Sequence, residues 1–275
     1  MIKPLLLICF FTFLIHLTGA LTYSMRLAGL RTRQIAIAMS FVSSSLLISR
    51  LSNMFQAPLV GTMVDGTILK ASNSALLTLE SNFRIIIFAA FLGSVAGAFL
   101  TPTMIILFQA AIKKFLHNGS IARTFLAAFK PVNLLKIIQA FRLPRFSSLK
   151  NISLKNIPKT FLILNMIVTG VYTIGVLCSL LASAYLPEMR ATAINLSGLV
   201  NGIATILFTL FVDPPGARIT DQAFHKQKTE NDVLSVVFYL NMGRIVGTLI
   251  LAQLFFKPFT VYIIYVTKIL SKYFM

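Results

Sequence analysis

Two arginines lie deep inside apolar stretches of the sequence, where a charge is costly. Arg50 lies in a stretch that begins at Gln34, and Arg244 lies near the centre of a later one. An arginine at the bilayer centre costs at least about 2.5–3.5 kcal/mol, so it normally faces a protein interior or a polar cavity. Its guanidinium stays protonated and offers paired donors to phosphate oxygens. We therefore expect Arg50 and Arg244 to bind an anionic group; the alternative is that they snorkel or cap helix carbonyls of a neighbouring span.

Two further arginines, Arg26 and Arg84, lie near the ends of apolar stretches. They are additional candidates for the same role, although snorkelling is equally expected there. All 7 Asp and Glu residues map to the ends of stretches or to the segments between them. The charge expected at membrane depth is therefore positive and has no acidic partner, which favours an anionic substrate such as a phosphate or pyrophosphate compound.

Polar side chains follow the same stretches. Asn53 and Gln56 lie three residues apart, so they share one helix face, and Arg50 extends that face by one turn. Asn201 and Thr205 share a face in a later stretch. We expect Asn53, Gln56 and Asn201 to line a polar path for a headgroup, or else to make hydrogen bonds between helices.

No catalytic or metal-binding constellation is present in the sequence. It contains no P-loop, no HExxH and no GxSxG motif. His16, His117 and His225 are dispersed, and Cys9 and Cys178 lie inside apolar runs. We therefore expect neither an enzyme nor a bound metal or cofactor, and any transport must follow a gradient unless a partner subunit supplies ATP.

Composition places this chain in the membrane. Hydrophobic residues make up 57% of its 275 residues and charged residues 12%, whereas soluble domains have roughly 45–50% and 25%. A crossing helix needs about 20 apolar residues. This predicts an all-α membrane protein with spans at about 4–25, 34–59, 84–111, 160–186, 192–213 and 233–256. The tail, 257–275, is separated by Lys257-Pro258 and is expected to be an interfacial helix or a seventh short span.

The net charge of +18 is concentrated in one segment between spans. Residues 113–159 contain many Lys and Arg residues and no acid, so this loop is expected to be cytoplasmic and a nucleic-acid partner is not indicated. Residues 121–141 carry apolar residues three or four apart with lysines between them, which predicts an amphipathic helix on anionic lipids of the inner leaflet. The alternative is a plain basic connector. Segments 60–83 and 187–191 and both termini then lie outside.

Two halves of the chain show a weak internal repeat. The motif Gly-x-x-x-Gly occurs at 93–97 and again at 243–247, and a proline is followed seven residues later by aspartate at 58–65 and at 214–221, both expected just beyond helix ends. This predicts three-helix units at 1–112 and 160–256, the basic loop 113–159 and the tail 257–275. Because each unit has an odd number of spans, the two must be inverted, as in many secondary transporters. The glycine pairs are equally consistent with packing inside the chain and with a dimer.

Three long segments carry a resemblance to a known family. They are IHLTGALTYSMRLAGLRTR at 15–33, ISRLSNMFQAPLVGTMVD at 48–65 and INLSGLVNGIATILFTLFVDPPGARITDQ at 194–222. They resemble the Amj-type lipid II flippases, described as an alternate to MurJ, and the resemblance extends over essentially the whole chain. It implies movement of an undecaprenyl-pyrophosphate-linked disaccharide-pentapeptide from the inner to the outer leaflet of the bacterial cell membrane for peptidoglycan synthesis. It identifies no site residues. A transporter of another anionic or polyprenyl-phosphate-linked substrate and a non-transporting scaffold subunit are the alternatives.

Overall fold

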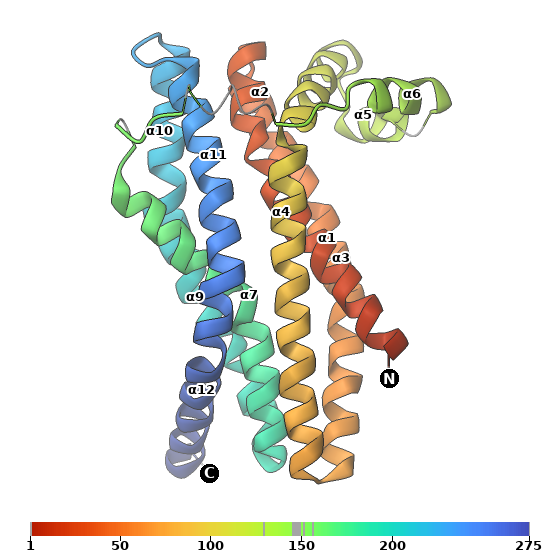
Figure 1. The fold of residues 1–275 in the computed structure, drawn as a ribbon, viewed down its shortest axis with the longest axis vertical. Helices are drawn as coiled ribbons and strands as arrows, with labels where there is room; N and C mark the ends of the chain where they lie inside the picture. The colour runs from red at the N-terminus through yellow and green to blue at the C-terminus, as the bar shows by residue number, and fades with distance from the viewer. Residues whose placement is uncertain (1, 129, 145–149, 151, 156, 275) are drawn as a thin grey trace.

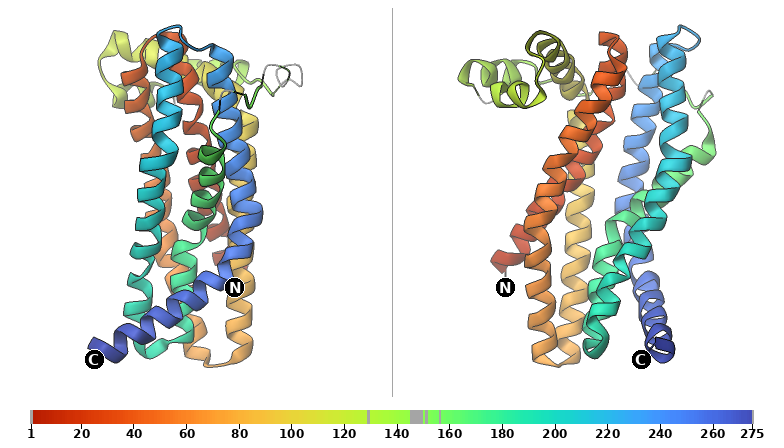
Figure 2. Two further views of the ribbon diagram at one scale, coloured as in Figure 1. Left: turned by 90° about the vertical axis from the view of Figure 1, so that its left-hand side faces the viewer. Right: turned by 180° about the vertical axis from the view of Figure 1, so that it is seen from behind.

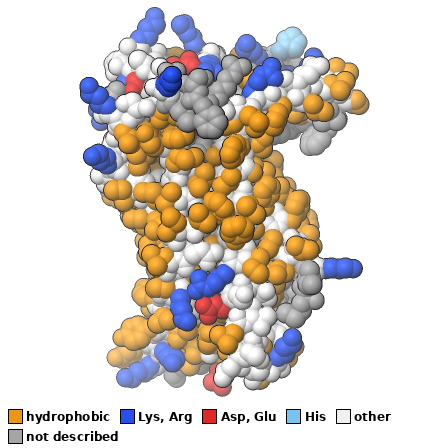
Figure 3. Space-filling model, viewed as in Figure 1, with side chains coloured by type: hydrophobic (Ala, Val, Ile, Leu, Met, Phe, Trp, Pro, Cys, Tyr) orange, Lys and Arg blue, Asp and Glu red, His pale blue; other side chains and the backbone are white. Residues whose placement is uncertain are grey.

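A computed structural model describes residues 2–128, 130–144, 150, 152–155 and 157–274. Within these ranges the secondary structure is helical and contains no strand. Six helices are long and apolar enough to cross a membrane, and they cover Lys3–Thr32, Ile35–Lys70, Asn73–Asn118, Lys159–Tyr185, Pro187–Phe224 and Glu230–Phe274. On the face shown in Figure 3, hydrophobic side chains cover the middle, and Lys and Arg side chains gather towards the two ends. The predicted all-α membrane protein with six spans is therefore confirmed.

The first half of the chain forms α1 (Ile2–Thr22), α2 (Ser24–Thr32), α3 (Ile35–Lys70) and α4 (Asn73–Asn118). The 36 residues of α3 and the 46 of α4 correspond to about 54 and 69 Å at 1.5 Å per residue, whereas the hydrocarbon core is about 30 Å thick. Both helices therefore extend beyond the spans predicted at 34–59 and 84–111. The end of an apolar run marks the edge of the hydrocarbon and not the end of the helix.

The basic loop carries α5 (Ile121–Ala128) and α6 (Pro131–Gln139), which project sideways from the bundle (Figure 1). The sequence predicted one helix over 121–141, and the structure has two. Lys130 is extended and Pro131 is the first residue of α6, because a residue that precedes proline avoids the helical conformation. Residues 129, 145–149, 151 and 156 of the loop, Arg145 among them, lie outside the described residues.

The second half begins with the long helix α7 (Lys159–Tyr185). The next span is built from η2 (Pro187–Met189), α8 (Arg190–Asn195), α9 (Ser197–Leu207), η3 (Phe208–Val212) and α10 (Asp213–Phe224). The last comprises α11 (Glu230–Val246), η4 (Gly247–Leu251) and α12 (Ala252–Phe274), and both η3 and η4 are π-helical turns.

Two proline positions differ from the prediction. Pro58 lies inside α3, and Asp65 lies in the same helix, so neither is beyond its end. Pro214 lies in the first turn of α10, where no N–H partner is required, and the helix continues past Asp221. The segment expected to be a loop from 214 onwards is therefore helical as far as Phe224.

The C-terminal tail continues the sixth span without interruption. α12 passes through Lys257 and Pro258. The sequence predicted that the second unit ends at 256 and that these two residues separate it from the tail, but the helix is continuous there. The chain instead changes direction at η4, and α12 diverges from the axis of α11 (Figure 2). A π-helical turn alters the register of the backbone hydrogen bonds and allows this bend.

The connections alternate between the two ends of the molecule. The α2–α3 connection, α5, α6 and the α10–α11 connection lie at one end, called the loop end below (Figure 1). The α3–α4 turn, the α7–α8 connection and the C-terminus lie at the opposite end (Figures 1 and 2). This arrangement agrees with the alternation on which the predicted topology depends.

Both Gly-x-x-x-Gly motifs pack helices within the chain. In the first half, a Cβ on Gly93 or Gly97 would collide with α1, at Phe13 or Ala20 respectively. In the second half, a Cβ on Gly247 would lie 2.6 Å from the carbonyl oxygen of Met166 in α7. The third span thus packs on the first and the sixth on the fourth by the same device, a close approach of small residues.

Candidate functional site

A cleft of about 380 Å³ lies where the two halves meet. Its walls come from α1, α3 and α4 of the first half and from α7, α8 and α9 of the second. The lining residues are Thr12, Ile15, His16, Asn53, Gln56, Ala57, Val60, Gly61, Ile86, Ile87, Tyr172, Thr173, Val176, Leu177, Leu180, Ile194 and Ser197. Because Asn53, Tyr172 and Ile194 are exposed, the cleft is open on one side.

The wall contributed by α1 and α3 is polar and ordered. The Gln56 amide donates a hydrogen bond of 2.6 Å to the Thr12 hydroxyl, which donates one of 2.9 Å to the carbonyl oxygen of Ile8. Asn53 lies one turn before Gln56 and also lines the cleft. The two amides predicted to share a face therefore meet at one cavity.

The opposite wall contains Tyr172 of α7. Its hydroxyl donates a 2.6 Å hydrogen bond to Thr205, whose hydroxyl donates one of 2.7 Å to the carbonyl oxygen of Asn201. The Asn201 side chain packs against Gly175, and its Oδ1 is buried without a partner. Asn201 therefore lies in the contact between α7 and α9, behind the lining residues, and not in the cleft where the prediction placed it.

His16 of α1 lines the cleft and is only 7% exposed. Its Nδ1 is buried and has no hydrogen-bond partner. Gly19, one turn further along α1, contacts the guanidinium of Arg244 from α11, and a Cβ there would collide with that group. The Nε of Arg244 is also buried without a partner. His16, which lines the cleft, and Arg244, which does not line it, thus meet neighbouring turns of α1, and each has one buried nitrogen without a partner.

Arg50 differs from Arg244 in its surroundings. It lies on α3 one turn before Asn53, but its side chain is exposed and does not line the cleft. Among the described residues, it makes no hydrogen bond or ion pair. Arg50 and Arg244 therefore share the property expected of anion-binding arginines, since neither is neutralised by an acid.

Arg26, in contrast, has an acidic partner. It is 8% exposed and forms an ion pair with Asp213 at the start of α10, and its guanidinium lies against Gly216, 3.1 Å from where a Cβ would be. The expectation of an unpaired arginine is wrong here, because the helical first turn of α10 brings the Asp213 carboxylate beside α2. Arg26 links the two halves at the loop end.

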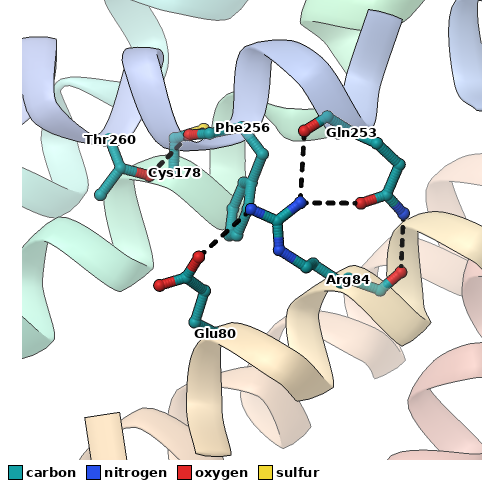
Figure 4. A network of polar contacts seen from close by, with 6 residues as sticks. All are labelled: Glu80, Arg84, Cys178, Gln253, Phe256 and Thr260. Carbon is teal, nitrogen blue, oxygen red and sulfur yellow. Dashed lines mark hydrogen bonds and ion pairs between the residues drawn. The ribbon is translucent and has the colours of Figure 1, made fainter. Parts of the chain in front are cut away.

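Arg84 is likewise neutralised within the protein (Figure 4). It pairs with Glu80 at 3.2 Å and donates to the backbone and side-chain oxygens of Gln253, each at 3.3 Å, while Gln253 donates to the Arg84 carbonyl oxygen at 3.0 Å. Its guanidinium also lies 5.6 Å from the centre of the Phe256 ring. Arg84 therefore joins α4 to α12, away from the cleft, and this corrects the second of the two end-of-span candidates.

Sequence reasoning missed His16, Thr12 and Tyr172 as cleft residues. A histidine and a threonine within an apolar run were visible signals, but only the packing of α1 against α3 and α4 shows which of its faces reaches the cleft. Within the described residues, no three His, Cys, Asp or Glu side chains lie close enough to hold a metal ion. Asn53 and Gln56 offer amide donors to the cleft, whereas no charged side chain is among its lining residues. Positive charge comes from Arg244, which contacts α1 at Gly19. The arrangement suits recognition of a polar or anionic group.

Two comparisons with known proteins point to the same family. A sequence model described as Amj, alternate to MurJ, matches residues 11–267. The chain is 36% identical over 267 residues to a Bacillus subtilis (strain 168) protein named lipid II flippase Amj, and the alignment covers 97% of each protein. No solved structure shows significant similarity to the chain.

Proposed function

The chain belongs to the Amj (alternate to MurJ) family, and from this premise we propose that it is a lipid II flippase. It moves the undecaprenyl-pyrophosphate-linked peptidoglycan precursor from the inner to the outer leaflet of the bacterial cell membrane, and it is a transporter, not an enzyme. The observation that carries this proposal is Arg244, an arginine inside a membrane-spanning helix whose Nε is buried without a partner. A fixed, unpaired cation at this depth suits a pyrophosphate headgroup.

Transport proceeds by alternating access between the two halves. The units 1–112 and 160–256 act as inverted three-helix repeats, and this is supported by the equivalent glycine contacts of α4 with α1 and of η4 with α7. The cleft between the halves holds the polar headgroup. Since it is open on one side, the polyprenyl tail stays in lipid.

The loop end faces the cytoplasm in this proposal. Its basic loop, 113–159, follows the positive-inside rule. α5 and α6 lie on the inner leaflet, with exposed apolar side chains such as Leu126, Leu135 and Ile138 in the lipid and Lys130 and Lys136 near anionic headgroups.

The substrate-binding residues proposed are Arg244, Arg50, Asn53 and Gln56. Arg244, which contacts α1 at Gly19 and is not among the residues that line the cleft, binds the pyrophosphate. The two amides donate to polar groups of the headgroup from the α3 wall. Arg50 lies one turn before Asn53 on α3, outside the cleft, and offers a second cation without an acidic partner among the described residues. Arg26 and Arg84 take structural roles, because each is committed to an ion pair within the protein. Asn201 packs against Gly175 in the α7–α9 contact, outside the cleft, although its Oδ1 has no partner.

The test is complementation in bacteria from which all other lipid II flippases can be depleted. The wild-type chain should restore lipid II at the outer leaflet, measured by its accessibility to an externally added enzyme. Arg244→Ala and Arg50→Ala should accumulate in the membrane and fail to restore it. Arg218→Ala, an exposed arginine of α10, is the matched control and should behave as wild type.

Two results would contradict the proposal in different ways. If the wild-type chain does not restore lipid II at the outer leaflet, it transports another polyprenyl-linked or anionic substrate or none. If both arginine variants complement fully at normal abundance, the proposed site is wrong although the function stands.

A further inference from the structure

His16 is an exception among the buried polar side chains of α1. Thr12, Thr18 and Thr22 each donate a hydrogen bond to a carbonyl oxygen of their own helix, at 2.7–2.9 Å. His16 is as buried as these threonines, yet its Nδ1 has no partner. A buried polar atom without a partner is costly and calls for a specific explanation. A ligand that enters the cleft would supply the missing partner, because His16 lines that cleft.

The packing around His16 fixes its position. A Cβ on Gly93 of α4 would lie 3.1 Å from the Cβ of His16, so α4 approaches closely behind the histidine. Gly19 leaves room for the Arg244 guanidinium on the same side of α1, since any larger residue would displace it. Two glycines thus create the space in which an imidazole from the first half and a guanidinium from the second lie together.

We propose that His16 and Arg244 together form the binding site for a phosphate group, which on the proposed function is the pyrophosphate of the lipid. The imidazole donates one hydrogen bond and the guanidinium donates others, so the anion is held by one group from each half. Neither group has an acidic partner among the described residues. Binding of the anion therefore connects α1 to α11 directly, at the place where the halves meet.

The experiment measures binding to the purified full chain in nanodiscs by isothermal titration calorimetry. The probes are farnesyl pyrophosphate and, as the uncharged counterpart, farnesol. The wild type should bind the pyrophosphate in clear preference to the alcohol. His16→Phe and Arg244→Gln should each weaken pyrophosphate binding by at least about tenfold, as expected for the loss of a hydrogen bond to a charged group.

Two variants serve as comparisons. His16→Gln keeps an N–H donor and should retain more affinity than His16→Phe. Thr18→Val removes a hydroxyl that is equally buried on α1 but bonds only to its own helix, and it should bind as wild type does. If His16→Phe binds farnesyl pyrophosphate as tightly as the wild type, or if the wild type does not prefer it to farnesol, the site is disproved.

A second measurement uses the wild-type protein alone, so it does not depend on whether a substituted protein folds. Diethyl pyrocarbonate modification of His16 in the wild-type protein, read by mass spectrometry, should be slowed by farnesyl pyrophosphate and not by farnesol. Equal modification with both ligands overturns the site. Failure of the wild type to restore lipid II in cells, with pyrophosphate protection intact, would instead reject the lipid II function and keep the phosphate site.

Discussion

The four arginines near or within spans fall into two pairs in the structure. Arg26 and Arg84 are committed to acids and amides of the protein, whereas Arg50 and Arg244 have no acidic partner among the described residues. The sequence could place all four near membrane depth, because apolar runs are visible in it. It could not identify the partner of Arg26, since Asp213 lies 187 residues away, whereas Glu80 lies only four residues before Arg84 and was a visible signal. Such distant pairs depend on tertiary packing and leave no local pattern.

The Arg26–Asp213 pair makes a prediction at this scale. Asp213→Ala leaves the nearly buried guanidinium without its partner and should lower the free energy of unfolding by about 1–3 kcal/mol. Removing both groups, in Arg26→Leu with Asp213→Leu, should cost less than Asp213→Ala alone, because no buried charge remains unpaired. Far-UV circular dichroism during heating measures these differences.

An exposed ion pair provides the control for this measurement. Arg31 pairs with the exposed Glu230 at the same end of the molecule, so Glu230→Ala should cost under about 1 kcal/mol. If Asp213→Ala is no more destabilising than Glu230→Ala, the Arg26 pair does not stabilise the joint between the halves.

At the scale of elements, the sequence predicted the helices well and their ends poorly. Hydrophobic length identified all six spans, but α3, α4 and α10 continue beyond the apolar runs into regions where no hydropathy signal is left. The bend at η4 was also missed. The sequence analysis placed the break at Pro258, because proline is recognisable in a sequence and a π-helical turn is not. The glycine motifs were recognised, but only the fold shows that they pack α4 on α1 and η4 on α7.

Glycines that differ only in their surroundings test this packing. Gly97→Ala should destabilise the protein and lower its abundance in the membrane, because the new Cβ collides with Ala20 of α1. Gly66→Ala in α3 meets nothing within 4 Å and should be neutral or more stable by up to about 1 kcal/mol, as usual for glycine to alanine in a helix. Thermal unfolding of both variants gives the comparison, and equal effects would refute the close contact.

The absence of tryptophan from the sequence makes α6 testable in the intact protein. Ile138 is 70% exposed, and Lys136 is two residues away on the other side of the helix. If α6 lies on the inner leaflet, Ile138→Trp should fluoresce at shorter wavelength and be quenched strongly by lipids brominated in their acyl chains. Lys136→Trp should be quenched less, and equal quenching would show that the helix does not lie with its apolar face in the lipid.

At the scale of the whole molecule, polar contacts join the halves at both ends. Arg26–Asp213 and Arg31–Glu230 lie at the loop end, and Arg190–Asp65, with N–O at 3.3 Å, lies at the opposite end. The alternation of connections was predictable from loop charges and an odd number of spans per unit. The ion pairs between the halves could not be predicted, because each joins residues that are far apart in the sequence and meet only in the folded protein. Alternating access requires that these contacts open at one end at a time.

Reversible cross-links test that requirement directly. In a background with Cys9→Ser and Cys178→Ser, which removes both native thiols, two cysteine pairs replace ion pairs: Arg31→Cys with Glu230→Cys at the loop end, and Asp65→Cys with Arg190→Cys at the opposite end. A bifunctional maleimide with a reducible spacer should stop lipid II movement in either variant, because each link prevents the halves from separating there. Reduction of the spacer should restore it.

The matching control is a link within one half. Ala71→Cys with Ser74→Cys lies on the α3–α4 turn, so the same reagent should leave transport unchanged. A link that stops transport at one end alone would show that only that end opens during the cycle. Undiminished transport with both interhalf links closed would mean that the halves do not move apart, and the substrate would then have to cross along the lipid-facing side of the cleft.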